Sequence, residues 1–203
     1  MTCCTNGHLT IVTPPSVEPV TLDDALEHCH ANSGVEDNWF NRIIKAARIE
    51  AESFQRRAYI EQTLQLSFDQ VPNFPIYLPR PPLIDVTGIS VFDMENVETA
   101  LTLTDFLIDT DSQPGRIMAN YDFSYPGISN REMKSMVITY KAGYGSDAST
   151  VPDDVKNAML FYIGYLYDHR AGELSYRFNV RESEFRREPK QFYDLLAKQR
   201  IYL

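Results

Sequence analysis

Apolar residues recur every three or four positions in two stretches near the start of the chain, which is the spacing of an amphipathic helix. The first stretch spans residues 21–30 and opens with Thr21, followed three residues later by Asp24, a capping box in its Asp form. The second stretch predicts a longer helix over residues 35–58. Its apolar positions predict one buried stripe, made of Phe40, Ile43, Ala47, Ala51, Phe54 and Ala58.

Two polar pairs add detail to the longer helix. Ser33 and Glu36 have the spacing of a second capping box, which predicts where the helix begins. Glu52 and Arg56 lie four residues apart, on the side away from the apolar stripe. We therefore expect them to form an exposed ion pair worth roughly a few tenths of a kcal/mol.

After Tyr59 the helical spacing gives way to alternation. Leu64, Leu66 and Phe68 alternate with polar residues, which predicts a half-buried strand. Four prolines between positions 75 and 82 exclude a central strand there and predict a stiff edge segment. Turns separate a further series of short, mostly antiparallel strands, expected near residues 87–92, 100–103, 106–108, 116–119 and 136–141.

The most apolar helix is predicted over residues 151–170. From Ala158 to Tyr167 it has no clearly polar face, so we expect it to be covered on more than one side. Two interpretations stay open, because the helix could be the centre of its own domain or could also pack against another copy of the protein. Aromatic residues favour an interface, and the residues of this core or ring packing are Phe161, Tyr162, Tyr165 and Leu166.

The order of the elements predicts the fold class. Two helices precede the strands and more helices follow them, so we expect an α+β protein in which the N-terminal and C-terminal helices form one bundle and an antiparallel β-rich block, residues 60–142, is inserted. Residues 1–19, which hold three prolines, are expected to form an extended arm. Residues 20–170 then make the main domain, and residues 171–203 make a C-terminal extension with a terminal helix.

Composition and charge narrow the function. The chain has 203 residues, 43% of them hydrophobic, and a net charge of −9, whereas a protein that grips phosphates is normally basic. From Arg170 onward, eight Lys or Arg face five Asp or Glu, which leaves the rest of the chain with a net charge of −12. The basic tail either docks on another protein or is a solvated segment, and the sequence leaves both interpretations open. No signal peptide or membrane span is visible, so we expect a soluble protein made in the cytoplasm.

The chain carries no motif that requires an enzyme, a cofactor or a metal. The P-loop, G-x-S-x-G, H-E-x-x-H and paired C-x-x-C patterns are missing from the sequence. The Gly-rich run 142–146 lacks a phosphate-loop Lys, so we interpret it as a strand-to-helix turn. His28, Cys29 and His30 are adjacent and would point in different directions on a helix, which disfavours a shared metal. The odd number of cysteines predicts reduced thiols.

Two stretches resemble a known family. Residues 46–93, AARIEAESFQRRAYIEQTLQLSFDQVPNFPIYLPRPPLIDVTGISVFD, are similar to its helix, alternating strand and Pro-rich segment. Residues 140–170, YKAGYGSDASTVPDDVKNAMLFYIGYLYDHR, resemble its second motif, and VTLDDALEHCH at 20–30 resembles its opening. Together they resemble the head–tail connector, or adaptor, proteins of tailed bacteriophages, over residues 20–170.

The resemblance implies a structural virion protein of the neck, at the head–tail interface. It implies a dodecameric ring under the portal protein that extends the DNA channel and offers a platform for the head-closure or tail protein. DNA would pass through without sequence-specific binding, with no cofactor and no catalysis. The C-terminal segment would dock on the portal through Arg186, Arg187, Phe192, Leu195, Leu196 and Arg200, unless its helix, which begins near Pro189, caps its own bundle.

Two other classes stay open at this point. A DNA-packaging or DNA-binding helical module would need a basic face, against which the net charge of −12 argues. A small enzyme would need a site assembled only in space, which the sequence does not reveal. A ring of copies would separate the connector from both classes.

Overall fold

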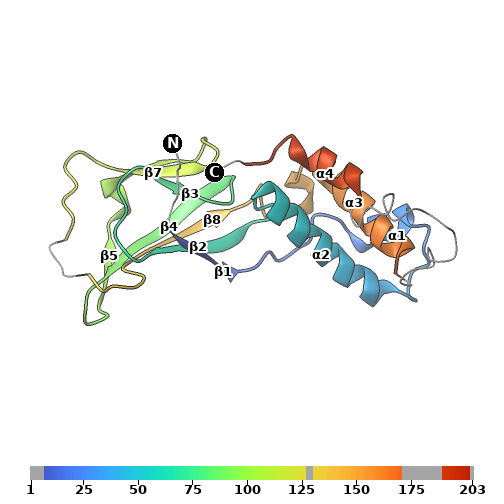
Figure 1. Ribbon diagram of the computed structural model, residues 1–203, viewed down its shortest axis with the longest axis horizontal. Helices are drawn as coiled ribbons and strands as arrows, with labels where there is room; N and C mark the ends of the chain where they lie inside the picture. Colours follow the sequence, from blue (N-terminus) through green and yellow to red (C-terminus); the bar gives the residue numbers. More distant parts are fainter. Residues whose placement is uncertain (1–6, 127–129, 171–188, 202–203) are drawn as a thin grey trace, which may run out of the picture. The chain divides into compact units, whose positions relative to one another are not determined.

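This computed structural model describes residues 7–126, 130–170 and 189–201, which divide into two compact units (Figure 1). The β unit contains residues 7–16 and 56–146 outside the 127–129 gap, and the helical unit contains residues 17–55 with 147–170 and 189–200. The protein is thus a mixed α+β structure with antiparallel sheets. Arg186, Arg187 and the charged linker of the C-terminal extension lie outside the described residues.

The β unit contains two sheets with one core between them. The larger sheet has the order β1-β2-β8-β4-β5 and the smaller has the order β3-β7-β6. Apolar residues from both sheets, among them Leu66, Ile89 and Ile117, form one buried cluster. The strands are β1 His8–Thr13, β2 Gln62–Phe68, β3 Ile76–Leu78, β4 Leu83–Phe92, β5 Glu98–Leu101, β6 Phe106–Asp109, β7 Gly115–Ala119 and β8 Met136–Ala142.

The Pro-rich segment forms an edge, as predicted. β3 pairs only with β7 and lies at one edge of the small sheet, where missing N–H donors are tolerated. The N-terminal arm contains a strand that the sequence analysis did not predict. Residues of β1 pair with β2 from His8↔Ser67 to Thr13↔Thr63 and form the edge of the large sheet. Sequence reasoning missed this strand because β1 is largely exposed and carries no alternating buried face.

The Gly-rich run after β8 is a turn, as predicted. Gly143 has φ +140°, and a Cβ there would lie 2.5 Å from the backbone carbon of Ile60. Only glycine fits such a close approach at this backbone angle. The N–H of Gly143 donates to the carbonyl of Pro82, which ties the turn to the start of β4.

The helical unit contains α1 Leu22–His28, α2 Asp37–Gln55, the short 3-10 helix η2 Ala148–Thr150, α3 Asp153–Asp168 and α4 Lys190–Ala197. α3 contacts each of the other three α-helices. The capping box of α1 is confirmed, since Thr21 Oγ1 accepts from the N–H of Asp24 while the Asp24 carboxylate accepts from the N–H of Thr21.

The prediction of a second capping box, between Ser33 and Glu36, is wrong. Glu36 precedes α2, and its carboxylate accepts hydrogen bonds from the Tyr167 hydroxyl and the Arg170 guanidinium, both at 3.2 Å. The residue that binds the backbone here is Asp37, whose Oδ1 accepts from the N–H of Gly34 at 2.8 Å. The pattern in the sequence matched a capping box, but the Glu36 side chain reaches the end of α3 instead.

The expected exposed pair of Glu52 with Arg56 is also wrong. α2 ends at Gln55, and Arg56 has a left-handed backbone with φ 57°. Glu52 is 3% exposed and accepts from Arg48 Nη1 at 2.9 Å, while Arg48 Nε donates to Glu18 at 2.7 Å. The helix therefore carries its ion pair on the buried side, where Glu18 from the preceding segment completes it.

Candidate interaction surfaces

α3 is buried along one face within the described part of the chain. Ala158, Met159 and Ile163 are fully buried against the other helices, whereas Phe161 is 42% exposed. The remaining members of the predicted packing surface, Tyr162, Tyr165 and Leu166, are half-buried. Because α1, α2 and α4 all contact α3, the expectation of cover on more than one side is met within the described residues, and the side around Phe161 stays open to another molecule.

α4 packs onto its own helical unit. Phe192 is 0% exposed and stacks on Tyr162 with ring centroids 4.7 Å apart, and Leu196 is 1% exposed. Gln55 Nε2 donates to the carbonyl of Leu196 at 2.8 Å. The guanidinium of Arg200 lies 4.6 Å over the ring of Phe54.

The anchors Phe192 and Leu196 are therefore engaged within the chain and do not face outward as portal-docking residues. In the structure this helix packs against α2 and α3 of its own helical unit. The sequence did not separate the two because an amphipathic helix has the same pattern in either case.

An acidic hollow lies between α1 and α3. It has a volume of ≈ 810 Å³ and is lined by side chains that include Asp24, Glu27, Asp153 and Leu160. Lys156 is the cation in its lining and contacts the Asp153 carboxylate at 3.4 Å. The exposed ring of Phe161 lies beside it, edge-on to His28 at 6.0 Å between centroids. This hollow combines apolar surface with an excess of negative charge.

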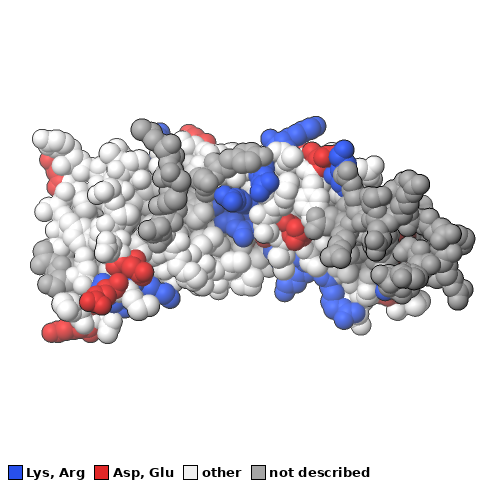
Figure 2. Space-filling view, viewed as in Figure 1, with Lys and Arg blue, Asp and Glu red and all other residues white. Residues whose placement is uncertain are grey.

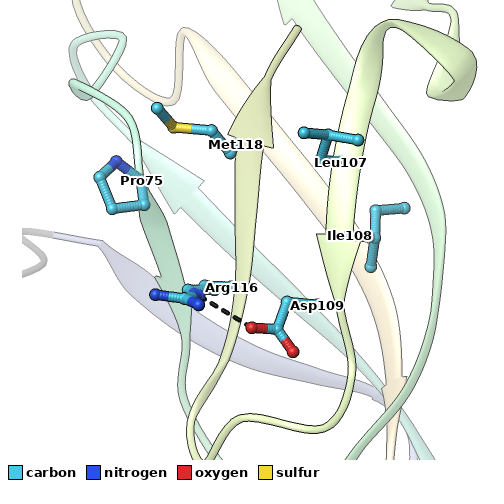
Figure 3. Close-up of a pocket in the computed structure, with 6 residues that line it drawn as sticks. All are labelled: Pro75, Leu107, Ile108, Asp109, Arg116 and Met118. Carbon is cyan, nitrogen blue, oxygen red and sulfur yellow. Dashed lines mark hydrogen bonds and ion pairs between the residues drawn. The ribbon is translucent and has the colours of Figure 1, made fainter.

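The outer face of the small sheet, called the platform below, carries apolar side chains at one end and an ion pair at the other (Figure 3). Leu107 of β6 lies directly opposite Met118 of β7, and they are 63% and 46% exposed. This face holds a shallow hollow of ≈ 330 Å³, which is lined by Pro75, Leu107 and Met118 among others. Two residue pairs along, Asp109 lies opposite Arg116 and accepts from its Nε at 2.9 Å.

The charged end of the platform is fixed by local hydrogen bonds. Ser112 donates its hydroxyl and its N–H to the Asp109 carboxylate at 2.7 and 3.1 Å. These bonds, with the bond from Arg116, lower the pKa of Asp109 to about 2. The aspartate is thus held in its ionised form, and its hydrogen bonds order the β6–β7 turn.

The turns that join β4 to β5 and precede β8 present exposed apolar side chains. Met94, Val97 and Met133 are 69%, 54% and 71% exposed. The two turns are tied together by Arg131, whose guanidinium donates to the carbonyl of Lys134 and to Asn96 and lies 4.0 Å over the ring of Phe92. These apolar side chains are held on ordered turns, which suits recognition of a partner.

Solved structures of other proteins share the fold of this chain. No family model and no curated protein matches the chain. Solved structures do match. A chain from the neck of an empty gene transfer agent particle, computed with C6 symmetry, superposes with a TM-score of 0.76 at 20% identity, over 97% of this chain and 96% of that one. A chain from the neck of the native particle, computed with C12 symmetry, superposes with a TM-score of 0.74 at 20% identity, over 97% of this chain and 96% of that one. This protein has the fold of those neck chains. A chain from the native virion gives 0.74 at 19% identity, over 96% of both chains.

Sequence reasoning missed the platform and the acidic hollow for different reasons. Alternation in the strand near 106–108 already places Leu107 on the face opposite Phe106, so the outward apolar side chain was visible as a signal. The hollow has no such signal, because Glu27 and Asp153 are far apart in the chain and meet only when α1 packs on α3. None of the helices in the described ranges combines the length and apolar character needed to cross a bilayer.

Proposed function

We propose that this protein is a structural component of the neck of a phage-type particle, where copies of it form a ring at the head–tail interface of the virion. The observation that carries the proposal is the match over 96–97% of both chains to the neck chains of the gene transfer agent particle. The match spans nearly the whole length of both chains, which supports a like role for the whole chain. The role is structural and not enzymatic.

The proposal includes a dodecameric ring. One neck chain that shares the fold comes from a structure computed with C12 symmetry and another from one computed with C6 symmetry. A ring needs surfaces that remain open in a single copy, and Phe161 with the half-buried residues of α3 supplies one. In this arrangement the helices from both ends of the chain form one bundle, and the β unit is its insertion.

The partners follow from the same proposal. The ring binds the portal protein on one side and a head-closure or tail protein on the other, and DNA passes through it without sequence-specific binding. Because Phe192 and Leu196 are buried in the chain, portal docking by the C-terminal segment would use its exposed basic residues and the half-buried Leu195. A DNA-binding module is the weaker alternative, since the chain is acidic overall with a net charge of −9.

Electron microscopy of the particle that carries this protein tests the proposal. A copy with an affinity tag on residue 1 would be incorporated and labelled with gold-tagged antibody. We expect label only at the head–tail junction, and rings with twelvefold symmetry in images of the chain purified together with its portal protein. Particles without label, and a chain that does not purify with the portal protein, would contradict the proposal.

A further inference from the structure

α2 presents a basic ridge on the side that faces away from the helical unit. Its buried residues, including Phe40, Ile44 and Ala47, face the other helices. Arg42, Lys45 and Ile49 are exposed, and three to four residues separate each from the next. Ile49 is 51% exposed and lies one helical turn after Lys45, at the end of the ridge. Lys and Arg side chains project over α2 along the lower edge in Figure 2.

The acidic hollow between α1 and α3 complements this ridge in shape and in charge. It is concave, its acidic residues outnumber its one Lys, and it offers Leu160 as apolar surface. The exposed ring of Phe161 lies at its border. Because α2 and α3 pack on each other through their buried faces, their exposed faces point away from each other. One copy therefore cannot fill its own hollow with its own ridge.

We propose that neighbouring copies pack head-to-tail, with the α2 ridge of one copy, Arg42, Lys45 and Ile49, seated in the α1–α3 hollow of the next. The inference rests on the proposed ring. A ring of identical copies needs two different, complementary surfaces on each copy. The cations meet Glu27 and Asp153, and Ile49 meets Leu160 and Phe161. Opposite charges fix the register of the contact, and the apolar residues supply the affinity.

Charge reversal in two separate variants tests this pairing. The ridge variant carries Arg42→Glu and Lys45→Glu, and the hollow variant carries Glu27→Lys and Asp153→Lys. Lys190→Glu with Lys198→Glu is the matched control, because both lysines are exposed on or next to α4 in the same unit. Circular dichroism first establishes that each full-length variant folds. Sedimentation velocity of the full chain at high concentration then measures self-association at about 50 mM and about 500 mM NaCl.

We expect the ridge variant and the hollow variant each to self-associate at least about tenfold more weakly than the wild type, because each confronts like charges. An equimolar mixture of the two should recover association, since every ridge then meets an opposite hollow. Rings with an even number of copies can close with such alternation. The wild type should weaken in high salt, and the control variant should behave as the wild type.

The outcomes separate this inference from the proposed function. If the ridge and hollow variants associate as the wild type does, or if their mixture does not recover association, the pairing is wrong. A wild type that stays monomeric at every concentration in low salt also overturns it. In each of these cases gold label at the head–tail junction would leave the neck assignment standing. If particles carry no gold label but the mixture of ridge and hollow variants recovers association, the neck assignment is refuted and the pairing stands.

Discussion

Arg48 decides the local structure around α2 at the scale of a single residue. Its guanidinium, only 5% exposed, joins Glu52 in the same helix to Glu18 in the segment before α1. Burial alone would lower the pKa of Arg48, but hydrogen bonds and charges from Glu18 and Glu52 outweigh it and raise the pKa. The arginine is therefore charged throughout the accessible pH range, and its two partners stabilise that charge.

Replacing Arg48 with Met should destabilise the protein by about 3 kcal/mol, because the buried carboxylate of Glu52 would lose its ion pair with the Arg48 guanidinium. Thermal unfolding measures the loss. Adding Glu52→Gln to Arg48→Met should recover part of it, since the stranded charge is removed. Arg116→Ala, which breaks a pair at the surface, is the control and should cost within about 1 kcal/mol. An Arg48→Met protein with the melting curve of the wild type would contradict the role of this cluster.

Asp109 gives a pH dependence whose direction follows from its lowered pKa. Its ordinary pKa is 3.8 and its folded pKa is about 2, so its contribution to stability is full above the ordinary value and is lost as the pH falls through 2. Ser112→Ala should raise the pKa of Asp109, because the hydroxyl of Ser112 is the strongest contributor. NMR titration of the carboxyl carbon measures both values. A wild-type midpoint near 3.8 would show that these hydrogen bonds do not form.

At the scale of elements, α4 is a short helix whose apolar face is used inside the chain. Besides the Phe192 stack, the Tyr193 hydroxyl donates to Glu50 at 3.2 Å and Gln199 Nε2 donates to Asp154 at 3.0 Å. These contacts join α4 to both α2 and α3. A helix of eight residues is marginal by itself in water, so its stability comes from this packing.

Phe192→Ala should therefore lower the stability of the helical unit by about 3 kcal/mol, within the usual range for a buried Phe. Ala197→Ser, at an exposed position of the same helix, is the control and should change stability by less than about 0.5 kcal/mol. Denaturant unfolding measures both. An unchanged unfolding curve for Phe192→Ala would return α4 to the role of a free portal-docking element.

At the scale of the whole molecule, the exposed apolar residues are spread over separate surfaces. Phe161 lies on α3, Leu107 and Met118 lie on the small sheet, and Met94 with Met133 lies on the β turns. No single surface in the described residues resembles the long continuous seam of a coiled coil. Assembly that depends on several modest contacts is sensitive to concentration and to a partner that organises the copies.

The purified chain should accordingly be monomeric at about 1 µM and should form rings mainly when the portal protein is present, because the portal raises the local concentration of copies. Multi-angle light scattering across a dilution series measures the mass of the free chain. The same measurement after addition of portal protein provides the comparison. A tight dimer that persists through dilution would contradict this expectation, since a closed twofold contact would compete with a ring.

Elements whose causes are local could be predicted from the amino-acid sequence. The Thr21–Asp24 capping box, the alternation of Leu64, Leu66 and Phe68, and the edge position forced by the prolines all follow from interactions within a few residues. The spacing of apolar residues and the missing N–H of proline act over that range, so both can be recognised in the amino-acid sequence.

Contacts between distant residues became visible only in the folded chain. Glu18 pairs with Arg48 30 residues away, β1 pairs with β2 across at least 50 residues, and Phe192 stacks on Tyr162. An amphipathic helix has the same pattern whether its apolar face meets its own domain or another copy, so the placement of α4 and the exposure of Phe161 were open in the sequence. Chain reversals bring Glu27 and Asp153 into the lining of one hollow, and no local signal in the sequence records that placement.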